Sequence, residues 1–177
     1  KDVLNFASLS KQEFLTNVNL DEILATVQTD LELLILEKSA KIQSQELPSI
    51  KAIPQQMQQL FYNLLSNGLK FTRKDQQPVI TISGRMLNDA EIKDHPDLSP
   101  AKQYYQLDVR DNGIGFQQQA AEKIFDLFQR LHNRDTYAGT GIGLALCKKV
   151  VTNHGGKIWA VSKEGEGATF TILLPAN

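Results

Sequence analysis

The sequence predicts one domain of mixed helices and strands, an α/β (α+β) fold. Two kinds of hydrophobic spacing support this. In some stretches apolar residues recur three and four positions apart, as in a helix with one buried face, and in others apolar and polar residues alternate, as in a half-buried strand. The chain has 177 residues, of which 41% are hydrophobic and 22% charged. These values are ordinary for a globular domain with one full core.

Composition narrows the classes of function and the compartment. A formal net charge of −1 gives no electrostatic reason to expect nucleic acid or an anionic membrane as a partner. The single cysteine, Cys147, excludes an internal disulfide and fits a reducing compartment. No apolar run approaches the roughly 20 residues of a membrane span. Because the chain begins at Lys1 within helix-compatible sequence, we expect a fragment of a longer protein.

The first 70 residues predict two long helices and one short strand. Residues 1–16 lose their helical spacing midway, which indicates the end of an upstream helix and a linker. A capping-box-like start at Asn19 predicts a helix over 20–38, followed by a strand near 40–45. Pro54 suits the first turn of a second helix, which we expect to reach Lys70.

The rest of the chain alternates strand patterns with helix patterns. Strands are predicted at 79–86, 105–109, 157–162 and 168–174. The segment 87–102 is rich in Asp, Ser and Pro and is interpreted as a surface hairpin loop. Helical spacing predicts helices over 120–128 and from Ile142 to Gly155, separated by a polar loop at 129–138.

Polar residues form a second stripe on the helix that begins at Pro54. The stripe consists of Gln56, Gln59, Asn63, Asn67 and Lys70, at steps of three and four. A solvated face is the simple interpretation. Asparagine is a mediocre helix former, however, so two of them one turn apart within a helix also suggest a function, and both interpretations stay open at this point.

Two glycine-rich stretches adjoin helix patterns. Gly139, Gly141 and Gly143 precede a helix, whose first turn carries unpaired N–H groups that suit phosphate, although a plain helix-entry loop is as good an interpretation. Asp111 ends a strand and is followed by Gly113 and Gly115. An Asn-Gly hairpin is the alternative there. Since helical spacing follows, we interpret Asp111 as a carboxylate beside open backbone, able to accept a hydrogen bond from an amino group of a bound ring.

Four segments together resemble a known family. They are NLLSNGLKF (63–71), DNGIGF (111–116), IFDLFQRLH (124–132) and GTGIGLALCKKVV (139–151). Their order and spacing resemble the N, G1, F and G2 boxes of the ATP-binding catalytic domain of sensor histidine kinases. The amino-acid sequence over 128–156 is most similar to that of phytochrome-like and PAS-linked bacterial kinases. The resemblance implies a two-layer α/β sandwich, in which helices cover one face of a mixed, mostly antiparallel sheet and ATP binds between helices and a lid.

The resemblance also implies a domain division and partners. Residues 18–177 would be the catalytic domain, and residues 1–17 the end of an upstream dimerisation domain that carries the phosphoacceptor histidine. No histidine precedes His95, so we expect ATP binding without autophosphorylation by this chain alone. The implied partners are that dimerisation domain, a response regulator receiver domain and a second copy of the full protein, in the cytoplasm, with no nucleic acid and no membrane contact.

The family pattern assigns roles to individual residues, with ATP and Mg²⁺ as cofactors. Asn67 resembles the Mg²⁺ ligand, Asn63 lies near the phosphates and Lys70 neutralises them. Asp111 matches the adenine-binding aspartate, supported through water by Thr169, and Arg130 could reach the γ-phosphate. Catalytic roles fall to Asn63, Lys70 and Arg130. The full set of expected cofactor contacts is Asn63, Asn67, Lys70, Phe71, Asp111, Gly113, Gly115, Gly139, Thr140, Gly141, Ile142, Gly143, Leu144 and Thr169.

Other features are interpreted as structural. Cys147 and Trp159 are expected in the core, His132 and His154 at surface or capping positions, and His95 in solvent. Gly68 departs from the family, which more often has Ala there, and predicts slightly looser packing without loss of function.

Three alternatives remain on the same boxes. ATPases of the gyrase, Hsp90 and MutL type use a general-base Glu where this chain has Asn63, and an amide cannot serve as that base. A degenerate signalling module without kinase activity is the second alternative. The third is a serine-kinase anti-sigma factor, against which the helical pattern at residues 1–16 argues.

Overall fold

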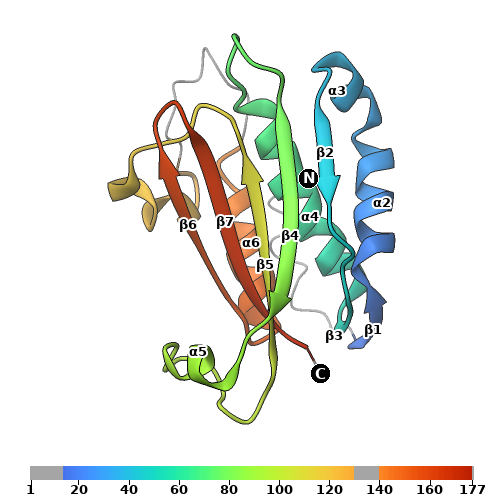
Figure 1. Cartoon of the computed structure of the whole chain (residues 1–177), viewed down its shortest axis with the longest axis vertical. Helices are drawn as coiled ribbons and strands as arrows, with labels where there is room; N and C mark the ends of the chain where they lie inside the picture. The colour runs from blue at the N-terminus through green and yellow to red at the C-terminus, as the bar shows by residue number, and fades with distance from the viewer. Residues whose placement is uncertain (1–13, 130–139, 177) are drawn as a thin grey trace.

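The computed structural model describes residues 14–129 and 140–176 of the chain. A five-stranded sheet forms one layer and helices cover one of its faces, as Figure 1 shows. The strands lie in the order β2-β4-β5-β7-β6. Their bounds are Lys41–Ser44 for β2, Val79–Met86 for β4, Tyr104–Asp111 for β5, Lys157–Lys163 for β6 and Gly167–Pro175 for β7. Only β2 and β4 pair in parallel, so the predicted mixed, mostly antiparallel sheet is confirmed.

Three helices make up the second layer. They are α2 (Leu20–Asp30), α4 (Pro54–Lys70) and α6 (Gly143–Asn153). Their apolar stripes pack on the inward side chains of the strands, in one cluster that includes Leu65 and Phe61 of α4, Val150 of α6 and Ile172 of β7. The cluster places α4 and α6 side by side against the centre of the sheet. The predicted two-layer sandwich is therefore confirmed.

A small second sheet was not predicted. Strand β1 (Thr16–Asn19) pairs antiparallel with β3 (Ser49–Ala52). Both strands have only four residues, and the paired residues lie 30 to 36 positions apart in the chain, so no local alternation reveals them. Asn19 at the end of β1 caps α2, because its side chain accepts a hydrogen bond of 2.9 Å from the backbone N–H of Asp21.

The single helix predicted over 20–38 is in fact two. Helix α2 ends at Asp30 and α3 runs over Glu32–Glu37. Between them Leu31 has φ −101° and ψ 8°, outside the helical range. Leu31 is 5% exposed, so the apolar spacing marks its burial correctly but does not reveal the change of backbone conformation at this residue.

The segment predicted as a surface hairpin loop, 87–102, contains a helix and a small core. Helix α5 (Asp89–Lys93) begins with a complete capping box between Asn88 and Glu91. Its Ile92 packs with side chains from the sheet face opposite α4 and α6. The cluster consists of Leu87, Ile92, Leu98, Tyr104 and Leu173, with Trp159 packed against it. The Asn-Asp-Ala-Glu sequence at 88–91 could have predicted the helix start.

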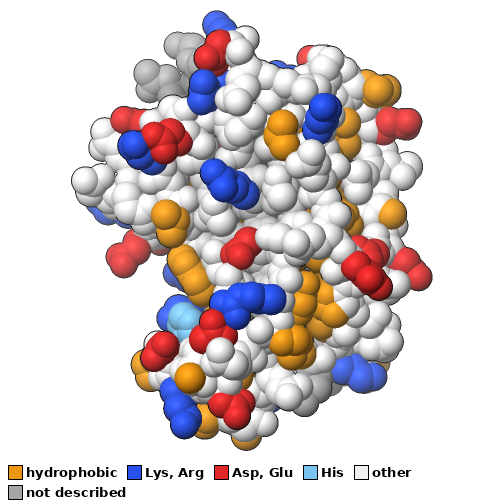
Figure 2. Space-filling view, viewed as in Figure 1, with side chains coloured by type: hydrophobic (Ala, Val, Ile, Leu, Met, Phe, Trp, Pro, Cys, Tyr) orange, Lys and Arg blue, Asp and Glu red, His pale blue; other side chains and the backbone are white. Residues whose placement is uncertain are grey.

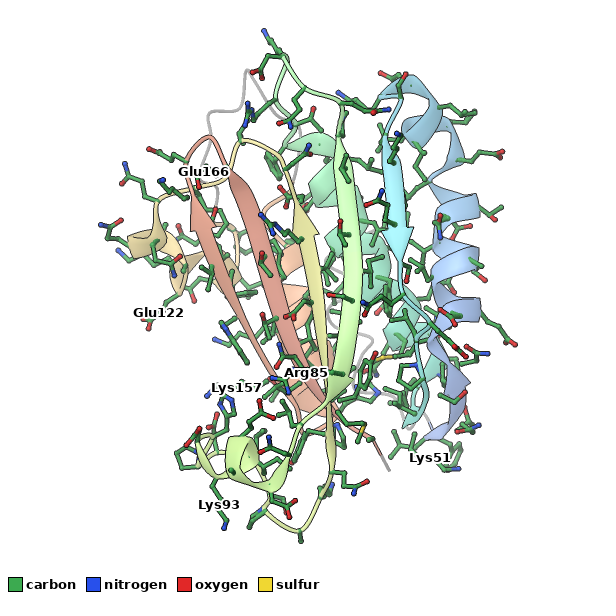
Figure 3. All side chains as sticks on the ribbon, viewed as in Figure 1. Lys51, Arg85, Lys93, Glu122, Lys157 and Glu166 are labelled. Carbon is green, nitrogen blue, oxygen red and sulfur yellow. The ribbon has the colours of Figure 1, made fainter. Side chains whose placement is uncertain are left out.

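Two ion pairs and an aromatic contact hold the α5 segment to the sheet. Arg85 pairs with Glu91 at 2.7 Å and Lys157 with Asp97 at 3.1 Å, at the end of the sheet shown in Figure 3. The Arg85 guanidinium lowers the pKa of Glu91 to about 2. His95 is half-buried, with its ring 5.5 Å from that of Trp159, so the expectation of a solvated His95 is wrong.

The helix predicted over 120–128 is also wrong. Two short 3-10 turns, η1 (Gln118–Ala120) and η2 (Lys123–Phe125), occupy this stretch. Ile124 and Phe125 are buried, with the Phe125 ring edge-on to Phe170 at 6.3 Å. The apolar spacing therefore reports burial correctly, but Asp126 is extended and ends the turn.

The face of the molecule in Figure 2 carries charges of both signs, interspersed. This agrees with the near-zero net charge and with the absence of an electrostatic signal for nucleic acid. Within residues 14–129 and 140–176, no helix is long and apolar enough to cross a membrane.

Candidate functional site

Helix α4 presents part of the predicted polar stripe, because Gln56 is 1% exposed and lies inside the molecule. Asn63 is half-buried and its Nδ2 donates a 2.9 Å hydrogen bond to the carbonyl of Gln59, one turn earlier. Asn67 is half-buried, and its side chain has no hydrogen-bond partner among the described residues. Lys70 is exposed at the end of the helix and forms no ion pair within the described part of the chain. An amide carbonyl and an amine are thus available to a ligand.

The N-terminus of α6 meets this stripe at Asn63. A Cβ placed on Gly143 would lie only 2.9 Å from Oδ1 of Asn63, so glycine allows the two helices to approach. Just before it, Gly141 has φ +73° and its carbonyl accepts a 2.9 Å hydrogen bond from the N–H of Phe128. The unpaired N–H groups of the first turn of α6 therefore lie beside the Asn63 amide, where an anion would be stabilised.

Asp111 stands at the other end of α4. It ends β5 on the face that packs against the helices, in phase with Leu107 and Val109. Its Oδ1 accepts a 2.8 Å hydrogen bond from the N–H of Gly113. Burial raises the pKa of Asp111 to about 6, although hydrogen bonds from the backbone at Gly113 and Ala168 oppose the rise. The carboxylate is held in place with acceptor capacity left over.

The turn after Asp111 is fixed by backbone contacts with the end of α4. Phe71 follows α4, and its carbonyl accepts a 2.9 Å hydrogen bond from the N–H of Ile114. A Cβ on Gly113 would lie 2.1 Å from that carbonyl, so only glycine fits. Asn112 closes the other side, since its Oδ1 accepts from the N–H of Val79 at 2.8 Å. Gly115 is buried at φ +61° within the same turn.

The structure does not bring Thr169 to Asp111. In the register of β5 and β7, Thr169 lies opposite Arg110 and Ala168 lies opposite Asp111. Side chains alternate between the two faces of a strand, so Thr169 points to the open face of the sheet while Asp111 points to the helices. Ala168 is the neighbour that the sequence analysis missed. Counting two-residue steps back from the inward Phe170 would have found it.

The remaining predicted contact residues differ in how far they are buried, and two of them lie outside the described part of the chain. Ile142 is 3% exposed and Leu144 is packed against the core, so each offers its backbone rather than its side chain to a ligand. Thr140 is exposed at the start of the glycine stretch. Arg130 and Gly139 lie outside the described residues.

A buried polar network behind the glycine turn was not predicted. Ser162 accepts from the N–H of Phe116 at 2.9 Å and donates to the carbonyl of Gly167 at 2.7 Å. Gln118 joins it, with Oε1 accepting from the N–H of Ser162 at 2.8 Å. The network ties the turn that follows Asp111 to strands β6 and β7. Single polar residues in a strand carry no sequence signal for such a role.

Taken together, α4 links an acceptor for a ring amino group near its C-terminal end, at Asp111, with an anion site near its middle, at Asn63. Gly68, beside Asp111, and Asn63, beside Gly143, are five residues apart, roughly 7.5 Å along the helix axis. That arrangement suits a nucleotide whose base lies at Asp111 and whose phosphates lie at Asn63. Within the described residues no three His, Cys, Asp or Glu side chains come together as a metal site, so a cation would rely on Asn67 and on ligand oxygens.

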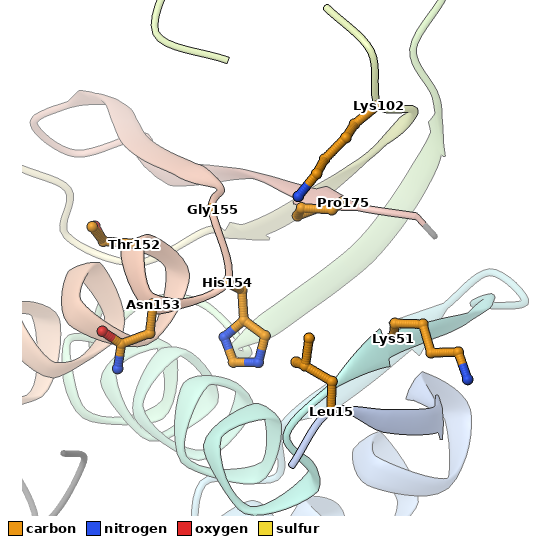
Figure 4. Close-up of a pocket in the computed structure, with 8 residues that line it drawn as sticks. All are labelled: Leu15, Lys51, Lys102, Thr152, Asn153, His154, Gly155 and Pro175. Atoms are coloured by element: carbon orange, nitrogen blue, oxygen red, sulfur yellow. The ribbon is translucent and has the colours of Figure 1, made fainter. Parts of the chain in front are cut away.

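One cavity of about 350 Å³ lies away from these residues, as Figure 4 shows. It is lined by Leu15, Lys51, Lys102, Thr152, Asn153, His154, Gly155 and Pro175. These residues surround the C-terminal end of α6, whereas Gly143 is at its N-terminal end. None of the predicted contact residues lines it.

The chain is similar to sensor kinases in sequence. It is 39% identical over 175 residues to the phytochrome-like protein Cph1 of Synechocystis sp., covering 98% of this chain and 21% of that protein. It is 32% identical over 181 residues to the adaptive-response sensory kinase SasA of Prochlorococcus marinus, covering 99% of this chain and 45% of that protein. The chain thus spans about a fifth to a half of the length of these relatives.

Solved structures share the fold of this chain, and a family model matches most of its length. The mycobacterial sensor histidine kinase MprB matches with a TM-score of 0.72 at 20% identity, covering 92% of this chain and 98% of that one. Full-length ShkA, in complex with AMPPNP, matches with a TM-score of 0.75 at 24% identity, covering 98% of this chain and 34% of that one. Both show the shared fold. The model of the histidine kinase-, DNA gyrase B- and HSP90-like ATPases matches residues 52–177. The chain therefore belongs to the family of histidine kinase-, DNA gyrase B- and HSP90-like ATPases.

Proposed function

We propose that this chain is the ATP-binding catalytic part of a two-component sensor histidine kinase. It would transfer the γ-phosphate of ATP to a histidine of a dimerisation domain upstream in the full-length protein. The observation that carries the proposal is the placement of Asn63 against the N-terminus of α6, with Asn67 one turn away and Asp111 beyond the other end of the stripe. Similarity to sensor kinases such as Cph1 and SasA supports the same class.

The base would be recognised by Asp111. Its ionised carboxylate accepts a hydrogen bond from the exocyclic amino group of adenine, while the N–H of Gly113 holds the other side. Guanine presents a carbonyl oxygen at the corresponding position, and two acceptors facing each other repel. Adenine is therefore preferred to guanine.

The phosphates would lie between Asn63, Lys70 and the first turn of α6. The fit to Mg²⁺ rests on the Asn67 amide, whose oxygen has no protein partner among the described residues and is a hard ligand of the kind Mg²⁺ takes. When bound, Mg²⁺ neutralises charge on the phosphate oxygens as the γ-phosphoryl group leaves. Lys70 adds a positive charge from the same helix face.

Hydrolysis of the gyrase type is the other activity on this fold. It needs a carboxylate on α4 as general base for water. Helix α4, Pro54–Lys70, contains neither Asp nor Glu, so it can hold phosphates but cannot activate a water. This favours transfer to a histidine over hydrolysis. A signalling module without kinase activity would bind the nucleotide in the same way, and it would differ from the proposed kinase only in not transferring the phosphate to a histidine.

The test is phosphotransfer in a longer protein that carries the upstream helical domain, with γ-labelled ATP and Mg²⁺. We expect acid-labile, base-stable label on a histidine, and a loss of at least about a hundredfold in rate for Asn67→Ala. If the wild-type protein binds nucleotide but no histidine is labelled, the kinase proposal is wrong, and a signalling module that only binds nucleotide is the function that remains. The longer protein also allows the other proposals to be tested. Its mass in solution tests the homodimer, transfer of the label to a receiver domain tests that partner, and cell fractionation tests the cytoplasmic location.

A further inference from the structure

Gly68, in the last turn of α4, lies directly over the inner face of the sheet. A Cβ placed on Gly68 would lie 2.7 Å from Cδ1 and 3.1 Å from Cγ1 of Ile80, and 3.5 Å from Cβ of Asp111. Carbon atoms of neighbouring side chains do not normally approach closer than about 3.5 Å. The packing at Gly68 is therefore tight, and the expectation of looser packing there is wrong: the Ile80 methyl group fills the place that an alanine methyl would take.

Ile80 and Asp111 are direct neighbours in the sheet. They face each other across β4 and β5 in the strand register, and both point toward α4. Ile80 is 1% exposed, and its other cross-strand neighbour is Ile42 of β2. The missing side chain of Gly68, the Ile80 methyl group and the Asp111 carboxylate thus form one packed contact.

We propose that Gly68 and Ile80 are a matched pair of positioning residues, which together set the distance between α4 and Asp111 and hence the fit of the nucleotide base. Neither touches the reacting atoms. The pair acts through Asp111 on one side and Asn67, next to Gly68 on α4, on the other. The inference rests on the proposed nucleotide function of these two residues.

The physical argument follows from burial on all sides of Ile80. An alanine at 68 forces the Ile80 methyl group to move by more than half an ångström. The nearest atom is the end of the Ile80 side chain, which absorbs part of the shift by turning about its own bonds. Because Ile80 is 1% exposed, the rest of the shift passes to Asp111 or Ile42, or lifts the end of α4 and with it Asn67. Overpacking of this kind usually lowers the free energy of unfolding. Replacing glycine by alanine within a helix raises it, so the two effects partly cancel. Stability should therefore change little, and ligand geometry should change more.

The experiment is a double-mutant cycle on this chain. Gly68→Ala, Ile80→Val and the double variant are titrated calorimetrically with non-hydrolysable ATP and GTP analogues in Mg²⁺, and their melting temperatures are recorded. We expect Gly68→Ala to raise the Kd for the ATP analogue about tenfold and to reduce the preference over the GTP analogue. Valine lacks Cδ1, so the double variant should bind within about twofold of wild type.

The matched control is Gly68→Ala combined with Ile82→Val. Ile82 lies two residues along the same face of β4 and is 0% exposed, but it is not under Gly68. This combination should not restore binding. If Gly68→Ala alone fails to fold, a folded double variant that binds normally still supports the pair.

Two results would overturn the inference while leaving the proposed function intact. One is a Gly68→Ala variant that keeps wild-type affinity and base preference, and the other is a folded double variant no better than Gly68→Ala alone. If instead the wild-type chain binds neither analogue, the proposed function fails, and the pair loses its ligand along with it.

Discussion

Asp111 lies at the end of the site where the nucleotide base is expected to bind. Its buried surroundings disfavour the ionised carboxylate that would accept a hydrogen bond from the base. Burial raises the pKa of this carboxyl from 3.8 to about 6, even with two backbone N–H groups facing it. Without ligand, the ionised form is therefore held at a cost in stability. A carboxylate kept in such a position without a cationic partner is typical of functional sites rather than of structural ones.

The first prediction concerns Asp111→Asn without nucleotide. The folded-state pKa is above the unfolded value, so the wild-type chain loses stability as the pH rises from about 4 to above 6 through this group. The cost above pH 6 is about 2–3 kcal/mol. Asparagine keeps the acceptor for Gly113 but not the charge, so Asp111→Asn should be more stable at pH 7 and nearly equal at pH 3.5, below the unfolded pKa. Thermal unfolding followed by circular dichroism at both pH values measures this.

In the same variant, binding of the ATP analogue should weaken, because an asparagine placed to accept from Gly113 turns its N–H₂ toward the adenine amino group. A variant that is less stable than wild type at pH 7 would show that Asp111 is a structural residue, against the role assigned to it.

His154 illustrates a residue whose role is structural. It follows α6 and is 9% exposed, with Nδ1 2.7 Å from the carbonyl of Val150 and Nε2 accepting from the N–H of Ile53 at 3.0 Å. These contacts place the proton on Nδ1 and join the end of α6 to the start of α4. The predicted capping role is confirmed.

Replacement of His154 by Ala should therefore destabilise the chain by about 1–3 kcal/mol, since the Ile53 N–H loses its acceptor. Urea unfolding gives the value. His95→Ala is the control, because His95 is half-buried beside Trp159 and should cost less. An equal or smaller loss for His154→Ala would contradict the capping role.

At the scale of elements, the errors of sequence analysis have a common physical origin. Apolar spacing reports which residues are buried, and it did so for Ile124 and Phe125 and for Leu31. It does not report whether the backbone stays helical between those residues, because that depends on tertiary contacts. The prediction that Thr169 supports Asp111 failed for a similar reason. Which residue of β7 faces Asp111 depends on how β7 pairs with β5, and the two strands are far apart in the chain.

The α5 element offers a test of how separate the two faces of the sheet are. Ile92 is 4% exposed in the small cluster opposite the helix layer. Ile92→Ala should cost about 2–4 kcal/mol in stability through the cavity it leaves. It should leave the Kd for an ATP analogue unchanged within twofold, because Asp111, Asn63 and Asn67 all lie on the other face.

Leu69→Ala is the matched comparison, since Leu69 is 0% exposed and lies on α4 beside the site. It should reduce both stability and affinity. If Ile92→Ala weakened nucleotide binding as strongly as Leu69→Ala does, the two faces would be coupled and the separation assumed here would fail. Calorimetric titration and chemical unfolding of both variants decide this.

At the scale of the whole molecule, local apolar spacing predicted most of the helices and strands, and the resemblance of the four boxes implied the two layers. The mixed sheet, the helices on one face and the meeting of α4, α6 and the Asp111 turn all agree with the prediction. Contacts that depend on long-range packing were beyond it, as with the β1–β3 sheet and the tight fit of Gly68 on Ile80. Membership of the ATPase family rests on the match over 52–177.

We infer that helix α4 joins an adenine site at Asp111 to a metal-dependent phosphate site at Asn63 and Asn67. The most direct test of this inference is calorimetric titration of this chain with a non-hydrolysable ATP analogue, with and without Mg²⁺, beside the GTP analogue. We expect saturable binding that is tighter with Mg²⁺ and at least about tenfold tighter for the adenine nucleotide than for the guanine nucleotide. Absence of binding at millimolar nucleotide, or equal binding of both analogues regardless of Mg²⁺, would contradict it.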